Sequence, residues 1–170
     1  MHRYALAGAL VLGLAFVGCD KVTDNQEVFQ ASLSGANENP VRATAASGTA
    51  QYVVDGDTIF YTVEISNIQG VNAGHIHTGA AGVNGGVIVF LIDPTPPATG
   101  ARAPLPNFTS TTGNAIIVEG TITRSTPLAQ GFTYDSLVAA MRAGTVYTNF
   151  HTATFPAGEI RGQVNPVNID

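Results

Sequence analysis

Residues 48–66 read GTAQYVVDGDTIFYTVEIS, and this stretch decides the fold class. In its second half, apolar side chains recur at every second position: Ile59, Tyr61, Val63 and Ile65. Successive side chains of a β-strand point to opposite faces, so the alternation predicts a strand over residues 58–66 with one buried face. The Asp55-Gly56 pair separates this run from the β-rich residues 48–54 and is a strong signal for a tight hairpin.

Similar β-rich runs lie on both sides of this hairpin, at residues 28–33, 73–77, 87–92, 115–123, 146–151 and 158–164. The six consecutive apolar residues at 87–92 indicate a central strand that is covered on both faces. Residues 93–107 contain five prolines and are predicted to form an exposed loop, because proline lacks the N–H that strand and helix interiors need.

One helix is expected, over residues 134–143. Thr133 or Asp135 can cap its start, and Gly144 stands where a left-handed residue commonly ends a helix. About eight short strands at regular spacing, together with one short helix, predict an all-β domain. Its expected architecture is a Greek-key β-sandwich or a barrel-like domain.

The composition excludes several other classes of protein. Of 170 residues, 45% are hydrophobic and only 11% are charged, which is unlike a disordered chain. The net charge of −5, with seven basic residues, argues against a nucleic-acid partner. The single Cys cannot form an internal disulfide or a Cys₄ zinc site. No nucleophile elbow or phosphate-binding loop occurs, so no organic cofactor is expected, and a non-enzymatic role is favoured over catalysis.

The N-terminal segment reads as a targeting signal. Residues 1–19 are MHRYALAGALVLGLAFVGC, a basic start followed by an apolar stretch too short for the roughly 20 residues of a membrane span. The end of this segment resembles a bacterial lipobox, in which Cys19 becomes the lipidated first residue. The alternative is an ordinary secretory signal with an incidental Cys. We therefore expect a lipoprotein of the bacterial cell envelope, extracytoplasmic and anchored to the inner or outer membrane.

This interpretation divides the chain into four segments. They are a signal peptide at 1–18, a lipidated tether at 19–27, a β domain at 28–165 and a C-terminal tail at 166–170. Beyond the signal, only three of the four His remain.

The three remaining His occur in two short segments that end predicted strands. His75 and His77 are two positions apart and share one strand face, while His151 ends the run at 146–151. If these strand ends meet, three imidazoles can bind one metal ion, and copper or zinc suits such a nitrogen site. The alternative is that the imidazoles only hydrogen-bond to the backbone of a Gly-rich turn.

A second pair of polar residues follows His151. Glu159 and Arg161 flank Ile160, so they are expected on one strand face. Glu159 could orient a His ring from behind, but the favoured interpretation is an ion pair between Glu159 and Arg161.

Three separated motifs carry a family resemblance: LSGANENP at 33–40, AGHIHTG at 73–79 with GVNG at 82–85, and YTNFHT at 147–152 with PAGEIRG at 156–162. With these motifs the chain resembles the CHRD domain family over about residues 28–165. The resemblance implies an extracytoplasmic β-sandwich-like module. The family's activity is poorly defined, so the resemblance does not by itself convert fold into function.

The leading hypothesis is a lipid-anchored protein whose domain binds one copper or zinc ion through His75, His77 and His151, for sequestration or delivery. A second hypothesis is a metal-free structural module that binds a protein or matrix partner. A third is a mononuclear copper redox protein.

Overall fold

The computed structural model describes residues 26–92, 109–111 and 115–167. The predicted signal peptide, Cys19 and the Pro-rich segment 93–107 lie outside these residues. The elements are, in chain order, β1 (Glu27–Ser34), the 3₁₀ helix η1 (Gly35–Asn37), β2 (Ser47–Asp55), β3 (Thr58–Ser66), β4 (Val71–Thr78), β5 (Val87–Ile92), β6 (Thr109–Thr111), β7 (Ala115–Thr123), α1 (Tyr134–Arg142), β8 (Val146–Thr152), β9 (Ile160–Gln163) and β10 (Asn165–Pro166).

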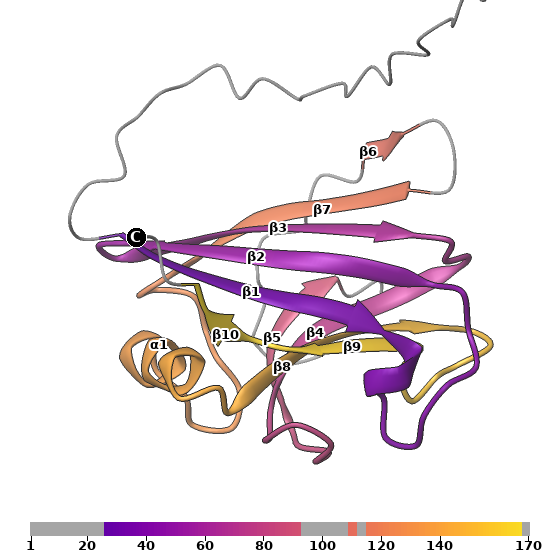
Figure 1. The fold of residues 1–170 in the computed structure, drawn as a ribbon. Coiled ribbons are helices and arrows are strands. Elements are labelled where there is room, and N and C mark those ends of the chain that lie inside the picture. Colours follow the sequence, from indigo (N-terminus) through magenta and orange to yellow (C-terminus); the bar gives the residue numbers. More distant parts are fainter. Residues whose placement is uncertain (1–25, 93–108, 112–114, 168–170) are drawn as a thin grey trace, which may run out of the picture.

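The strands form one antiparallel sheet that is nearly closed into a barrel. Their order is β5-β4-β8-β9-β1-β2-β3-β7-β6, and β10 also pairs with β1. Figure 1 shows the sheet as two facing layers, with β1, β2, β3 and β7 in one and β4, β5, β8 and β9 in the other. The all-β prediction is confirmed, and the barrel-like alternative describes the curled single sheet best.

The hairpin of β2 and β3 turns at the predicted Asp55-Gly56 pair. Asp55 pairs with Thr58, and Gly56 at the turn has a φ of +56°, which glycine adopts readily. The four alternating apolar side chains of β3 are at most 2% exposed. They pack with residues of the facing layer into one hydrophobic core, and burial of this apolar area is the main stabilising contribution to the fold.

One buried hydrogen bond joins the two layers through this core. The Tyr52 hydroxyl on β2 lies 2.6 Å from the Thr148 hydroxyl on β8, and neither side chain is exposed to solvent. Burial raises the pKa of Tyr52, so the phenol stays protonated and can donate to Thr148. The polar groups satisfy each other where water cannot reach.

The helix α1 forms where the sequence predicted it. Thr133 caps its start, and Thr133 and Ser136 form a reciprocal capping box. Gly144 follows the helix with a φ of +63°. The apolar face of α1 is buried in the core by Tyr134, Leu137, Val138 and Met141.

Both faces of β8 are buried, and only one of them faces the hydrophobic core. Thr148 and Phe150 lie on the core side, whereas Tyr147 and Asn149 lie on the opposite side and are each 2% exposed. Two loops cover this second side, one around Asn39 and one around residues 82–84. They are joined by two hydrogen bonds: the side chain of Asn39 donates to the carbonyl of Gly82, and the side chain of Asn84 donates to the carbonyl of Asn39. The fold therefore contains a polar buried layer outside the barrel core.

The strands near the C-terminal end differ from those expected. The last long strand begins at Ile160, because Gly158 has a φ of +122° that an extended strand does not contain. Pairing also continues into the expected C-terminal tail, where Pro166 lies opposite Phe29 and the Val167 N–H donates to the Val28 carbonyl. Among the described residues, no helix is long and apolar enough to cross a membrane.

Replacing Thr148 by Val tests the bond between the layers. The variant leaves the buried Tyr52 hydroxyl without a partner, and such a loss costs about 1–3 kcal/mol of unfolding free energy. The double variant Tyr52→Phe with Thr148→Val removes both polar groups and should recover most of that loss. Urea denaturation of both variants measures the difference. Equal destabilisation of the two variants would contradict the assignment.

Candidate metal centre

Pairing of β4 with β8 brings the three predicted His residues together. His75 lies opposite Asn149, and the neighbouring pair of the ladder sets His77 opposite Tyr147. His151 is two residues beyond Asn149, so it projects from the same face of β8. The three imidazoles thus meet in the polar layer outside the barrel core, although His151 is 74 residues from His77 in sequence.

The imidazole nitrogens are close enough to share one ion. Nδ1 of His75 lies 3.1 Å from Nε2 of His151, and one nitrogen of each ring lies within 4.8 Å of those of the other two. Tetrahedral zinc with Zn–N distances of about 2.0–2.1 Å separates its nitrogen ligands by about 3.3 Å. The closest pair is already near that separation, and the widest must draw together when an ion binds.

Backbone carbonyls fix the orientation of two of the rings. Nδ1 of His77 donates to the Gly85 carbonyl at 3.0 Å, and Nδ1 of His151 donates to the Pro156 carbonyl at 3.1 Å. Each bond places the proton of a neutral ring on Nδ1 and leaves Nε2 as the nitrogen that can bind a metal. In His151 this Nε2 accepts a hydrogen bond from Nδ1 of His75, and an ion would replace that bond. Nε2 of His77 is buried and has no hydrogen-bond partner among the described residues.

Burial keeps the three imidazoles neutral. His75 and His77 are only 9% and 8% exposed, and His151 is half-buried. Loss of hydration lowers the pKa of His75 to about 3, with smaller contributions from the charges that His151 and His77 would carry. Burial also lowers the pKa of His77 and of His151, against the opposing effect of their carbonyl partners. Neutral rings present lone pairs to a cation at physiological pH.

Aromatic side chains pack against the rings of His75 and His77. The ring of His77 stacks on Tyr147 at a centroid distance of 5.0 Å and an interplanar angle of 7°. Phe90 of β5 meets His75 edge-on at 5.0 Å. The guanidinium carbon of Arg161 lies 4.1 Å from the centroid of the Tyr147 ring, within the range of a cation–π contact.

Arg161 belongs to a buried ion pair with Glu38, a residue that the sequence analysis did not single out. Their side chains are 4% and 2% exposed, and the closest nitrogen and oxygen are 3.1 Å apart. Arg161 also donates to the side-chain oxygen of Asn84. Burial raises the pKa of Glu38 more than Arg161 lowers it. A buried pair of this kind is costly to break, because a lone charge would remain without hydration.

The prediction of an ion pair between Glu159 and Arg161 is wrong, because each side chain has other partners. Glu159 accepts hydrogen bonds from the hydroxyls of Thr44 and Thr152, each at 2.7 Å. These two donors satisfy its carboxylate, and Arg161 turns to Glu38 instead. Neither Glu159 nor Arg161 hydrogen-bonds to a described imidazole, although the positive charge of Arg161 contributes to the lowered pKa of His77 and His151.

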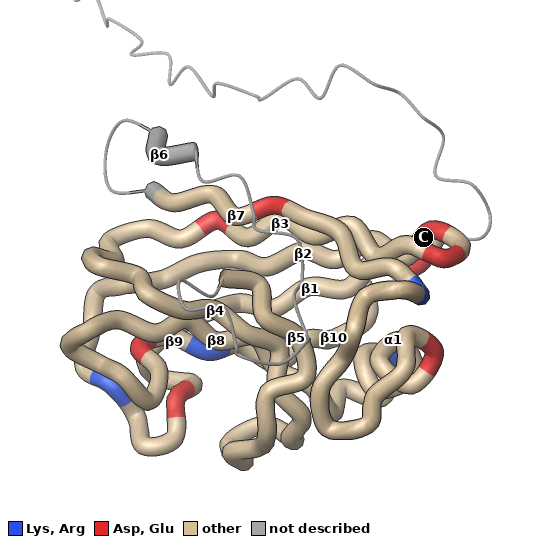
Figure 2. Tube along the Cα trace, turned by 180° about the vertical axis from the view of Figure 1, so that it is seen from behind, with Lys and Arg blue, Asp and Glu red and all other residues tan. Residues whose placement is uncertain are grey.

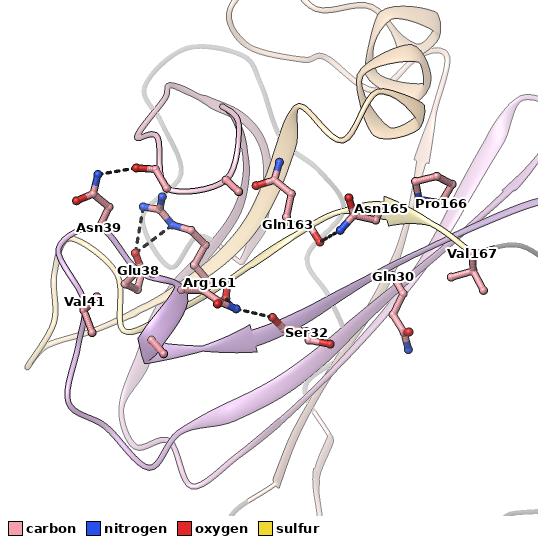
Figure 3. A pocket seen from close by; sticks show the side chains of 14 residues that line it. Gln30, Ser32, Glu38, Asn39, Val41, Arg161, Gln163, Asn165, Pro166 and Val167 are labelled. Carbon is pink, nitrogen blue, oxygen red and sulfur yellow. Dashed lines mark hydrogen bonds and ion pairs between the residues drawn. The ribbon is translucent and has the colours of Figure 1, made fainter.

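A groove of about 760 Å³ lies beside Arg161 and is bordered by residues of η1 and β10. Figure 3 shows it bordered by both uncharged polar and apolar residues, with the pair of Glu38 and Arg161 at one end. Gln163 is anchored there by donating to the carbonyls of Gly79, Gly144 and Val146. Charged residues are sparse along the rest of the described chain as well, as the colours in Figure 2 show.

The structure adds Asn149, Tyr147, Gly85 and Glu38 to the predicted site residues. Asn149 and Tyr147 could have been found from the sequence, since both alternate with His151 along one strand. Gly85 and Glu38 carry no such signal, because loops bring them to the site and loop geometry does not follow from residue spacing.

The fold and the clustered imidazoles define a small all-β domain with a candidate mononuclear metal centre. The CHRD domain family model matches residues 29–164, and the chain belongs to this family. The match spans β2 to β9, and so it includes all three His and the segments that surround them. Searches of curated proteins and of solved structures found no match to this chain.

Replacing Gly85 by Ala should disturb the centre without touching a His. A Cβ at this position would lie 1.7 Å from the Thr78 carbonyl oxygen, so the loop must move and carry the Gly85 carbonyl away from His77. We expect a changed imidazole NMR signal for His77 in a protein that stays folded. Ala80→Ser, at an exposed position of the same loop, is the control. An unchanged His77 signal in Gly85→Ala would show that the carbonyl does not orient the ring.

Proposed function

We propose that the domain binds one copper or zinc ion through His75, His77 and His151, and that it serves to sequester or deliver this ion. The observation that supports the proposal best is the convergence of three neutral imidazoles from two strands, with their nitrogens within 4.8 Å of one another. Imidazole is a preferred ligand of both metals.

The surroundings of the rings support binding more than catalysis. Backbone carbonyls fix the rings of His77 and His151, and the His77 ring is also stacked on Tyr147. These contacts limit the rearrangement of the rings that is needed when an ion binds. His151 is the most accessible ligand and offers a route for exchange with solvent. The Glu38 carboxylate in the polar layer is paired with Arg161, so it is not free to act as an acid or a base.

Isothermal titration of the purified, metal-stripped protein with Zn²⁺ or Cu²⁺ tests this proposal. We expect one ion per chain and a loss of at least about 100-fold in affinity when all three His are replaced by Ala, because even outer-shell partners are worth about 10- to 100-fold. Glu64→Gln, at an exposed position of β3, is a matched control that should bind like the parent.

Equal affinity of the triple variant and the parent would refute the proposal. Absence of binding by the parent would do the same, and would favour the metal-free binding module instead. Catalytic turnover by the copper-loaded parent with oxidants or reductants would favour the mononuclear redox protein.

We further propose that a lipid on Cys19 anchors the domain to a membrane of the bacterial cell envelope, on its extracytoplasmic side. This rests on the order of residues 1–19, where an apolar stretch of signal-peptide length ends at the only Cys of the chain. Acyl chains stabilise membrane attachment by about 0.8 kcal/mol per buried methylene.

Mass spectrometry of the N-terminal peptide from protein produced in bacteria tests the anchor. We expect a peptide that begins at Cys19 and carries acyl groups, found in the membrane fraction. In Cys19→Ser the acyl mass should be absent and the protein should leave that fraction. A peptide that begins elsewhere and lacks acyl groups would rule out the anchor.

A further inference from the structure

Asn149 carries a buried oxygen that lacks a partner. The residue is 2% exposed, and its Oδ1 accepts no hydrogen bond from any described residue. Nε2 of His77 is buried without a partner as well. Oε1 of Glu38, in the same layer, is the third such atom. Buried polar atoms in native proteins are almost always paired with protein, water or an ion, so these atoms require an explanation.

The amide of Asn149 is oriented by its surroundings. Its Nδ2 and the Oε1 of Glu38 both lie beside the α-carbon of Gly158, since a Cβ built there would be 2.9 Å and 2.5 Å from them. The amide donor therefore faces the carboxylate, and this proximity lowers the pKa of Glu38 against the effect of burial. Oδ1, on the other branch of the amide, is turned away from Glu38.

The strand register puts this oxygen among the imidazoles. Asn149 lies directly opposite His75 and two positions before His151 on the same face of β8. Its amide also borders the ring of His77, whose pKa it raises against the lowering by burial. Since Nδ1 of His77 donates to Gly85, Nε2 is an acceptor, and two acceptors cannot satisfy each other.

We infer that Oδ1 of Asn149 is the fourth ligand of the ion held by the three His residues. The inference rests on the proposed function and refines it, because a cation satisfies both orphaned acceptors at once. Three imidazoles and one amide oxygen complete the four ligands that closed zinc sites use. A carbonyl-type oxygen is a hard ligand, so Asn149 favours Zn²⁺ and Cu²⁺ over Cu⁺, which prefers softer ligands.

Asn149→Leu, a replacement of nearly the same shape, removes the oxygen. We expect the purified variant to lose at least about tenfold in Zn²⁺ affinity, by titration, relative to the parent. Its Cu²⁺ complex should show a changed electron paramagnetic resonance spectrum. The affinity for Cu⁺ should fall less than that for Zn²⁺. Asn72→Leu, the same replacement at an exposed position of β4, is the matched control, and it should retain the parental affinity and spectrum.

A purely structural Asn149 would give a different result. If it only braces Glu38 or holds a buried water, the Cu²⁺ spectrum and Zn²⁺ affinity of Asn149→Leu will match the parent, and the inference is overturned while the three-His proposal stands. A parent that binds no metal overturns both. If Asn149→Leu does not fold, the double variant Asn149→Asp with Glu38→Gln tests the inference instead. This variant exchanges the amide of residue 149 with the carboxylate of residue 38, so an oxygen remains at position 149. It should bind Zn²⁺ more tightly than Glu38→Gln alone, and equal or weaker binding overturns the inference.

Discussion

The pairing of β4 with β8 is the constraint on which the rest of the site depends. It sets His75 opposite Asn149 and His77 opposite Tyr147, and it buries Ile76, from the other face of β4, in the barrel core. Because side chains alternate between faces, a slip of one residue in this register would move the imidazoles into the hydrophobic core. The core therefore fixes the register, and the register fixes the polar layer.

Loops that cover β8 turn a sheet surface into a buried site. Hydrogen bonds link Asn39 to Gly82 and Asn84 to Asn39, and Arg161 reaches both Asn84 and Glu38. These contacts exclude water from the imidazoles, which is the main cause of their lowered pKa values. The same segments form the motifs around residues 33–40 and 82–85, so the recognisable sequence features of this domain surround the candidate centre.

Strand positions and the shared face of His75 and His77 could be predicted from the sequence, because both follow from the period-two alternation of side chains. The meeting with His151 could only be stated as a condition, because it depends on the pairing of β4 with β8. The run 58–66 indicated a strand with one buried face, and the spacing of His75 and His77 placed them on one side. The partner of Arg161 could not be predicted this way. Glu38 reaches it across 123 residues of chain, through a loop whose path depends on tertiary contacts. The nearby candidate, Glu159, was satisfied by two Thr hydroxyls that no pattern revealed.

The charge of the polar layer favours a site that retains an ion over one that turns over a substrate. Arg161 and Glu38 cancel each other, and the lowered pKa values leave the imidazoles uncharged. A cation entering this layer would meet uncharged rings, but it would have to replace the hydrogen bond between His75 and His151 and bring its charge into a poorly hydrated region. Ligand bonds must offset that cost, and each added donor helps to do so. The oxygen on Asn149, already buried and without a partner among the described residues, would have no hydrogen bond to give up on meeting an ion.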